Sequence, residues 1–234
     1  MDNMDLILRD VKVRENVLMK NVYLWMFAGL LLTAAVAFGV SSSVTVLRLI
    51  YSNPFVTILI FIAQLALVMV LSSKVETLSQ GAAVGLFLGY SALTGVTFST
   101  IFIAYTGQTI FMAFISAAAV FGAGAVYGML TKKDLRSWGG YLTMGLIGLL
   151  IATTLNLFIG STGFDMMVSV IGVVLFTGLT AWDSQRVADM NSSYGPYMTR
   201  EELTKVGILG ARSLYLDFLN IFLYLIRIFG RSDR

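Results

Sequence analysis

Seven long apolar stretches constrain the fold of this chain more than any other feature, because the tails and short segments outside them hold nearly all of its charges. A membrane-spanning helix needs about 20 mostly apolar residues, whereas a tilted spanning strand needs only about 9–11. The stretches here have helical length and show no strand-like alternation. We predict an all-α integral membrane protein whose seven transmembrane helices cover Val22–Ser41, Pro54–Leu71, Gly81–Tyr105, Ile110–Leu130, Gly139–Ile159, Met166–Gln185 and Gly207–Phe229.

The composition indicates one membrane domain. Charged residues make up 12% of the chain and hydrophobic residues 57%, and the charged share is about half of that in a typical soluble domain. A soluble fold of this length cannot bury so much apolar surface, whereas lipid can solvate it. We predict a cytoplasmic tail over residues 1–21, a transmembrane domain over 22–230 and a short basic tail over 231–234. The net charge of +3 gives no reason to expect nucleic-acid binding.

The distribution of lysine and arginine predicts the orientation, because these residues collect in cytoplasmic loops. If the N-terminus is cytoplasmic, 12 of the 16 basic residues lie on the cytoplasmic side and only Arg48, Arg227, Arg231 and Arg234 lie opposite. We predict this orientation, although the basic tail disagrees with it, and a re-entrant last segment is the alternative. The chain shows no eukaryotic sorting signal, and its first 20 residues do not resemble a signal peptide. We therefore expect a bacterial inner membrane.

Two glycine patterns predict where helices pack closely. Gly81, Gly85 and Gly89 recur every four residues, and Gly124 and Gly128 have the same spacing. Faces of small residues let helix backbones approach one another in lipid. Glycine is also simply frequent in membrane helices, so the pattern alone leaves both explanations open.

The absence of two residue types narrows the possible chemistry. The chain contains no cysteine, which excludes disulfides, thiol nucleophiles and Cys-ligated metals, and it contains no histidine. Histidine is the only side chain that titrates near neutral pH without help from its surroundings. Any pH response near neutrality therefore requires a carboxylate or a lysine in an unusual environment.

Two aspartates lie inside the apolar stretches, Asp183 near the cytoplasmic end of the sixth and Asp217 within the seventh. At 1.5 Å per residue, Asp217 lies about 16 Å beyond Val206 and so close to the middle of the bilayer. A charge at that depth costs at least about 2.5–3.5 kcal/mol and normally finds a partner inside the bundle. If the two carboxyl groups face each other, repulsion and burial favour one proton held between them. Such a pair titrates in two coupled steps.

Each candidate also has a simpler explanation. Asp183 can be an interfacial residue that is exposed to cytoplasmic water, and Asp217 can be hydrogen-bonded to Asn220, its polar neighbour one turn along. Lys74 ends the second predicted helix and is a candidate charge partner for an aspartate. A lysine at a helix end can equally extend to the membrane surface.

The residues around these aspartates resemble the Bax inhibitor-1 family, also called the transmembrane Bax inhibitor motif family. The run SLYLDFLNIFLYLIRIFG, from Ser213 to Gly230, is similar to the last-helix signature of that family. Thr94-Gly95-Val96-Thr97 resembles its third-helix signature, and Trp182-Asp183-Ser184-Gln185 resembles its sixth-helix aspartate motif, which usually has tyrosine in place of Trp182. The last-helix run is specific, whereas the other two would be weak alone. The likeness covers nearly the whole chain and indicates a bacterial member.

What the resemblance implies is a pH-dependent calcium leak through a fold in which six helices surround a central seventh. Asp183 and Asp217 match the aspartate pair that serves as pH sensor and gate, and that meets calcium transiently and weakly. Lys74 lies nearest to a basic residue that engages the pair, within a loosely matching segment. Gln64 falls where other members often have an acidic residue, so a calcium ligand on the second helix is not matched. No cofactor is implied, and calcium is the permeant ion.

Two other classes of function compete with a leak channel. Intramembrane aspartyl proteases also use two aspartates, but their Gly-x-Gly-Asp motif is absent because Leu214, Tyr215 and Leu216 precede Asp217. We therefore expect no enzymatic activity. A proton-coupled secondary transporter is the stronger rival, although the inverted repeats and interrupted helices typical of that class are not visible. The bilayer and calcium ions are the expected partners, and the sequence indicates no particular protein partner.

Overall fold

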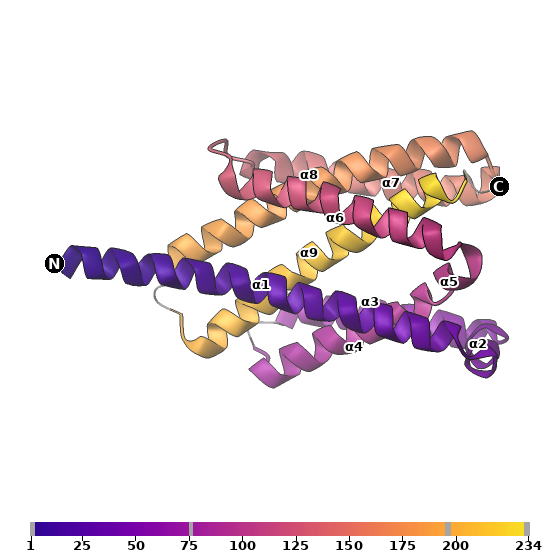
Figure 1. Cartoon of the computed structure of the whole chain (residues 1–234), viewed down its shortest axis with the longest axis horizontal. Helices are drawn as coiled ribbons and strands as arrows, with labels where there is room; N and C mark the ends of the chain where they lie inside the picture. The colour runs from indigo at the N-terminus through magenta and orange to yellow at the C-terminus, as the bar shows by residue number, and fades with distance from the viewer. Residues whose placement is uncertain (1–2, 75–76, 195–197, 232–234) are drawn as a thin grey trace. The chain divides into compact units, whose positions relative to one another are not determined.

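A computed structural model describes residues 3–74, 77–194 and 198–231 and, in that part of the chain, contains helices and no strands. The helices are α1 (Asn3–Ser41), α2 (Val44–Tyr51), α3 (Pro54–Lys74), α4 (Gln80–Phe98), α5 (Ile101–Ala104), α6 (Gly107–Leu130), the short 3₁₀ helix η1 (Arg136–Trp138), α7 (Gly139–Ile159), α8 (Thr162–Tyr194) and α9 (Arg200–Phe229). Figure 1 shows their order along the chain.

Seven of the described helical stretches are long and apolar enough to cross a membrane, which confirms the predicted fold class. They cover Leu18–Ser41, Pro54–Lys74, Gln80–Ala104, Gly107–Leu130, Arg136–Ile159, Thr162–Met190 and Glu201–Phe229. The backbone of the N-terminal segment continues α1 back to Asn3, while the side chains of residues 3–17 lie outside the description. Of the predicted basic tail, Arg231 is described and residues 232–234 are not.

The third predicted helix is broken near its end. The N–H of Ser99 donates to the carbonyl of Gly95 (3.0 Å) and, less directly, to that of Val96 (3.2 Å), and α4 ends at Phe98. The carbonyl of Val96 also accepts the hydroxyls of Ser99 (2.7 Å) and Tyr51 (2.8 Å). Local hydroxyl bonds compete with the helical ladder, so α5 follows as a separate short turn.

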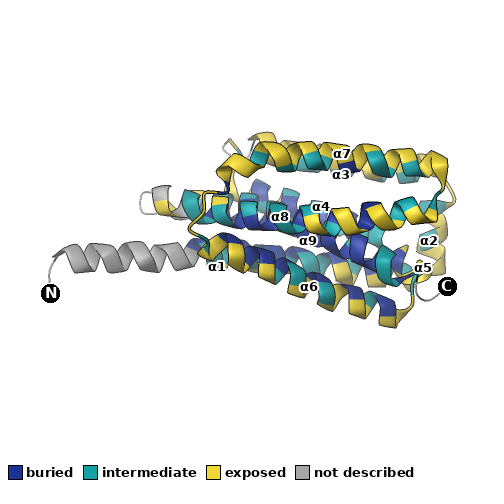
Figure 2. Ribbon diagram, turned by 90° about the horizontal axis from the view of Figure 1, so that it is seen from above, coloured by how far each residue is buried: buried dark blue, intermediate teal, exposed yellow. Residues whose placement is uncertain are grey.

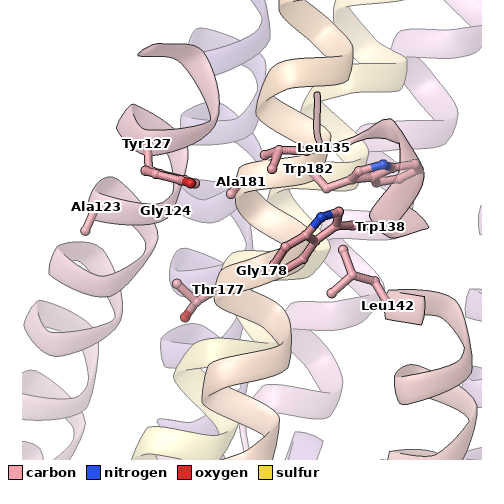
Figure 3. A pocket seen from close by; sticks show the side chains of 10 residues that line it. All are labelled: Ala123, Gly124, Tyr127, Leu135, Trp138, Leu142, Thr177, Gly178, Ala181 and Trp182. Atoms are coloured by element: carbon pink, nitrogen blue, oxygen red, sulfur yellow. The ribbon is translucent and has the colours of Figure 1, made fainter. Parts of the chain in front are cut away.

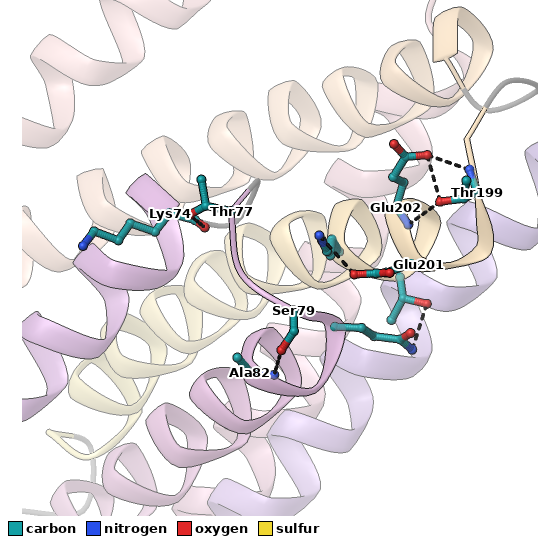
Figure 4. A network of polar contacts seen from close by, with 10 residues as sticks. Lys74, Thr77, Ser79, Ala82, Thr199, Glu201 and Glu202 are labelled. Atoms are coloured by element: carbon teal, nitrogen blue, oxygen red, sulfur yellow. Dashed lines mark hydrogen bonds and ion pairs between the residues drawn. The ribbon is translucent and has the colours of Figure 1, made fainter.

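Side-chain caps fix where two of the spanning helices begin, both visible in Figure 4. The hydroxyl of Ser79 accepts the N–H of Ala82 at the start of α4 (3.3 Å). At the start of α9, the N–H of Thr199 donates to Glu202 (2.7 Å), and the N–H of Glu202 donates back to the Thr199 hydroxyl (3.3 Å). This reciprocal arrangement is a capping box, and it starts α9 well before its apolar stretch.

The chain divides into two compact units. Unit 1 comprises Met1–Tyr105 and Met190–Tyr215, and unit 2 comprises Thr106–Asp189 and Leu216–Arg234. In unit 1, α1 and α4 cross at Gly95, where an added Cβ would lie 2.6 Å from the carbonyl oxygen of Thr33. Gly95 belongs to the Thr94–Thr97 motif, so this motif has a packing role in which the close backbone approach requires glycine.

One of the two predicted glycine faces packs closely and the other does not. In unit 2, a Cβ on Gly128 would lie 2.1 Å from the carbonyl oxygen of Ala181 on α8, and the Gly124 position is also tight. By contrast, Gly81 and Gly85 have nothing within 4 Å, so close packing was wrongly predicted for the first face. The spacing is the same in both cases because it records only that a face is small, and not whether another helix covers it.

α9 is the most buried spanning helix. In its apolar window 61% of residues are buried, against 33% or less in the other six spans, and Figure 2 shows the contrast between α9 and the yellow, exposed ribbons of α3 and α7. α9 runs without interruption from Arg200 to Phe229, which favours a spanning last helix over the re-entrant alternative, and the side on which the tail lies stays a prediction. The encirclement of α9 by six helices and the cytoplasmic N-terminus stay predictions.

Candidate functional site

Asp183 of α8 and Asp217 of α9 contact each other within unit 2. Their carboxyl groups are joined by a side-chain hydrogen bond, and Thr180 of α8 also lies within hydrogen-bonding distance of Asp217. Only 9% of Asp183 and 5% of Asp217 is exposed, so the interpretation of Asp183 as a water-exposed interfacial residue is wrong. Two carboxyl groups can share a hydrogen bond only when one of them carries a proton. The contact therefore has the geometry that a shared proton requires.

Two polar side-chain atoms near this pair have no hydrogen-bond partner in the described part of the chain. Oδ2 of Asp217 and the hydroxyl of the neighbouring Ser184 are buried and have no partner there. The hydroxyl of Thr180 donates to the carbonyl of Phe176 (2.8 Å) as well as lying within hydrogen-bonding distance of Asp217. A buried polar atom without a partner costs about 1–3 kcal/mol. Water, a further proton or a cation would be stabilised at this position.

Aromatic packing fixes α9 beside the pair. The ring of Phe218, the residue after Asp217, meets Phe114 and Phe121 of α6 edge to face, with centroids 5.6 and 5.7 Å apart. Two turns further along α9, the ring of Tyr224 covers Gly172 of α8, where an added Cβ would lie 2.6 Å from the ring. These contacts hold α9 against α6 and α8 on either side of the aspartate.

Ion pairs join the far ends of the same two helices. Arg231, just beyond α9, donates to Asp165 in the first turn of α8 (2.7 Å) and to the carbonyl of Thr162. Arg227 lies 3.9 Å from the other oxygen of Asp165 and stacks over the ring of Tyr224, 5.6 Å from its centroid. The carboxylate of Asp165 is thus shared by two guanidinium groups.

The residue two positions before Asp217 belongs to a polar cluster in unit 1. The hydroxyl of Tyr215, which is fully buried, lies 2.6 Å from the hydroxyl of Thr33, and Thr33 donates to the carbonyl of Ser91 (2.9 Å). The rings of Phe87 and Tyr90 pack edge to face on Tyr215. Tyr215 has no distinguishing signal in the sequence, because hydropathy does not reveal which tyrosine of an apolar helix is buried.

Lys74 has an exposed side chain at the end of α3, in unit 1, whereas the aspartate pair is in unit 2. Its assignment as charge partner therefore stays a prediction. Arg212, five residues before Asp217 on α9, is one of the 12 basic residues that are predicted to lie on the cytoplasmic side. Its guanidinium donates to the hydroxyls of Ser72 on α3 and of Ser213. It is thus an arginine that contacts the end of α3.

The remaining polar candidates are used within or between helices. The side-chain amide of Asn220 donates to the carbonyl of Leu216 (2.8 Å), so the alternative in which Asn220 serves as the partner of Asp217 is wrong. Gln64 donates to the hydroxyl of Thr97 (3.3 Å). No group of three or more acidic, histidine or cysteine residues that could hold a metal occurs among the described residues.

Comparison with known proteins gives consistent matches over most of the chain. The family model described as inhibitor of apoptosis-promoting Bax1 matches residues 15–234. The inner membrane protein YbhL of Escherichia coli K12 is 47% identical over 91% of this chain and 90% of its own length. A protein of Deinococcus radiodurans is 42% identical over 92% of this chain and 90% of its own length. A protein of Borreliella burgdorferi is 39% identical over 93% of this chain and 95% of its own length.

Proposed function

This chain belongs to the Bax inhibitor-1 family of membrane proteins, and from that premise we propose that it is a pH-sensitive calcium leak channel. Asp183 and Asp217 are its proton sensor and gate. The observation that carries the proposal is the buried hydrogen-bonded contact of these two carboxyl groups between α8 and α9. The chain has no histidine, so a proton-linked response near neutrality depends on such a pair.

The pair couples protonation to helix spacing through electrostatics. With one proton, the hydrogen bond ties α8 to α9 and the pair carries one negative charge. Loss of that proton places two negative charges together in a poorly solvated position, and repulsion then separates the helices unless a cation enters. A second proton removes the negative charge that attracts calcium. Both steps belong to the pair as a unit, since strongly interacting groups titrate together.

The pair suits passage of calcium better than storage of it. Calcium prefers six to eight oxygen ligands, and two carboxylates with neutral hydroxyl, carbonyl and water oxygens form a weak site. Conduction requires that an ion both enters and leaves readily. The side-chain oxygens that have no partner near the pair, Asp217 Oδ2 and Ser184 Oγ, are the neutral or anionic groups that such an ion would meet.

A proton-coupled transporter is the alternative, and the continuity of the two helices that carry the pair argues against it. Transporters of that class place their sites where spanning helices are broken, whereas α8 and α9 are continuous helices where they carry Asp183 and Asp217. We propose no enzymatic role for the pair. The helices hold it without the peptide motif of the intramembrane aspartyl proteases.

Calcium flux into proteoliposomes, scanned over pH, tests the proposal. The parent should show a pH-dependent leak, and Asp217→Asn should flatten that dependence. Asp189→Asn is the matched control, because Asp189 lies on the same helix α8 but pairs at the surface with Arg136 (2.8 Å). A parent that passes no calcium at any pH would refute the leak. Calcium uptake that requires an opposing proton gradient would favour the transporter.

A further inference from the structure

An apolar groove runs along α8 within unit 2, and Figure 3 shows its lining. Its volume is about 300 Å³, at the lower end of the range for small-molecule sites. The floor is made by small residues of α8, Thr177, Gly178 and Ala181. One wall comes from α6 and the other from the segment between α6 and α7 and the start of α7. These walls consist of Ala123, Gly124 and Tyr127 on one side, and of Leu135, Trp138 and Leu142 on the other, with Trp182 at one end.

The groove exists because two neighbours touch α8 through glycines. Gly124 and Gly128 bring α6 against α8, as described above. On the other side, an added Cβ on Gly139 would lie 2.9 Å from the ring of Trp182, and one on Gly178 would lie 3.2 Å from Leu142. Between these two close contacts, the residues of α8 that form the floor are no larger than threonine. The groove is therefore held open by helix packing on both of its sides.

The groove is distinct from the aspartate pair. Successive residues of an α-helix are rotated by about 100°, so Asp183 projects about 160° away from Ala181 and about 140° away from Gly178. The groove thus occupies the face of α8 that points away from the side chain of Asp183. A ligand in the groove would contact α8 without entering the proposed calcium path.

Three basic residues lie near the end of the groove that carries the tryptophans, Arg186 by its side chain and Lys132 and Lys133 by the position of their segment. The guanidinium of Arg186 stacks over the Trp182 ring, 5.5 Å from its centroid. Lys132 and Lys133 lie in the connecting segment, whose backbone is fixed to α8 by Gln185. The side-chain N–H of Gln185 donates to the carbonyl of Lys133 (2.9 Å), and the side-chain oxygen of Gln185 accepts the backbone N–H of Leu135 (2.7 Å).

The acidic residues nearby do not cancel this charge. Asp189 pairs with Arg136 (2.8 Å), and Asp134 accepts the backbone N–H of the same arginine (2.9 Å). From Lys132 to Arg136 and from Asp183 to Asp189, the surface groups outside the aspartate pair comprise four basic and two acidic residues. The mouth of the groove is therefore cationic, while its walls are apolar and aromatic.

We infer that this groove binds one anionic phospholipid, with an acyl chain along α8 and the phosphate near Arg186, Lys132 and Lys133. The apolar walls match a hydrocarbon chain, and tryptophans such as Trp138 are favoured at the headgroup level of a bilayer. Basic pockets between membrane helices select anionic headgroups, and each nearby basic side chain contributes about fivefold in affinity. The site does not depend on the proposed calcium leak.

Quenching of tryptophan fluorescence by brominated lipids tests the inference. The chain has three tryptophans, and Trp25→Phe leaves Trp138 and Trp182, both of which line the groove. The full-length variant is placed in liposomes with brominated phosphatidylglycerol or brominated phosphatidylcholine at equal mole fractions. Phosphatidylglycerol should occupy the site several-fold more effectively. Arg186→Gln should reduce that preference about fivefold.

A pair of matched variants separates the groove from ordinary lipid contact. Ala123 lines the groove and is exposed, so Ala123→Phe fills the groove without disturbing the core, and it should abolish the preference for the anionic lipid. Ala119, one turn earlier on α6, is also exposed but does not line the groove, and Ala119→Phe should leave the preference intact.

Three results would overturn the inference. Equal quenching by the two lipids would mean ordinary bilayer contact only. Equal behaviour of the two phenylalanine variants would place the selective site elsewhere. If neither lipid quenches the tryptophan fluorescence, and quenching falls further as the protein density in the liposomes rises, another protein chain occupies the groove. If Ala123→Phe does not fold, an unchanged lipid preference in Arg186→Gln refutes the charged mouth on its own.

Discussion

Arg231 and Asp165 form an ion pair of 2.7 Å that joins the end of α9 to the first turn of α8. Arg227 shares the same carboxylate at 3.9 Å. In the predicted orientation these two arginines are among the four basic residues that lie on the side opposite to the cytoplasm. Their pairing with Asp165 gives them a structural role that the charge count could not include.

Loss of this pairing should destabilise the protein. Arg231→Ala should lower the free energy of unfolding by about 1 kcal/mol, the upper part of the range for partly exposed pairs, and Arg227→Ala should cost less because its contact is longer. Thermal unfolding in detergent measures both. Arg136→Ala, which removes a pair whose arginine is 68% exposed, is the control with an expected change close to zero. An equal loss in all three variants would contradict the assigned roles.

Replacement of Gly128 should disturb the contact between α6 and α8. In Gly128→Ala, the new Cβ would lie 2.1 Å from the backbone oxygen of Ala181, so the helices must separate. Overpacking of this kind costs about 1–3 kcal/mol. Gly122→Ala on the same helix meets nothing within 4 Å and should be neutral or slightly stabilising, because alanine favours helix. Thermal unfolding of the two variants compares them directly, and equal stabilities would contradict the close approach.

The two aspartates should behave as one titrating unit. Asp183→Asn and Asp217→Asn should each flatten the pH profile of calcium flux in liposomes, and the double variant should add little, because groups in direct contact are not additive. The measurement is a double-mutant cycle on flux at several pH values. If both single variants kept the pH profile of the parent, the proposed sensor would be wrong.

Lys74 is predicted to offset negative charge on the pair. Lys74→Met should shift the pH midpoint of the calcium leak upward, because removal of a cation disfavours ionised carboxylates. The same flux assay measures the midpoint. An unchanged midpoint would identify Lys74 as an anchor at the membrane surface. Lys20→Met, which removes an exposed lysine at the predicted start of the first span, controls for a general loss of positive charge.

The orientation is tested independently of function. Reporter fusions after Lys20, Arg136 and Lys205 should all report the cytoplasm if the N-terminus is cytoplasmic and seven helices cross the membrane. A reporter that is active on the other side when fused at Arg136 would be incompatible with the predicted topology.

The sequence predicted the spanning helices well because lipid leaves them few alternatives. A run of apolar residues must be helical in a bilayer, where each backbone group needs an internal partner, and the predicted starts at Pro54 and Gly139 and ends at Ser41 and Ile159 match the observed ones. Helix ends in water were missed. α8 continues to Tyr194, because helix propensity extends past the point where hydropathy falls.

Features that depend on contacts between distant residues were harder to predict from the sequence. The depth of the two aspartates made a contact between Asp183 and Asp217 one of the alternatives, the family resemblance favoured it, and the structure brings the two together. The direction of the Asn220 side chain and the contact of Arg212 with Ser72 depend on rotamers and on the packing of neighbours. Neither has a signature in a single sequence, since spacing defines a helical face without showing what covers it.

The bond between Thr33 and Tyr215 joins residues that are 182 positions apart, and this separation has a consequence for biosynthesis. Chains emerge from the ribosome and fold from the N-terminus, so α1 enters the membrane long before its partner on the last helix has been made. The buried hydroxyl of Thr33 then relies on the carbonyl of Ser91 until α9 arrives. Truncation before α9 would therefore leave six helices in the bilayer, with Thr33 lacking its second hydrogen-bond partner.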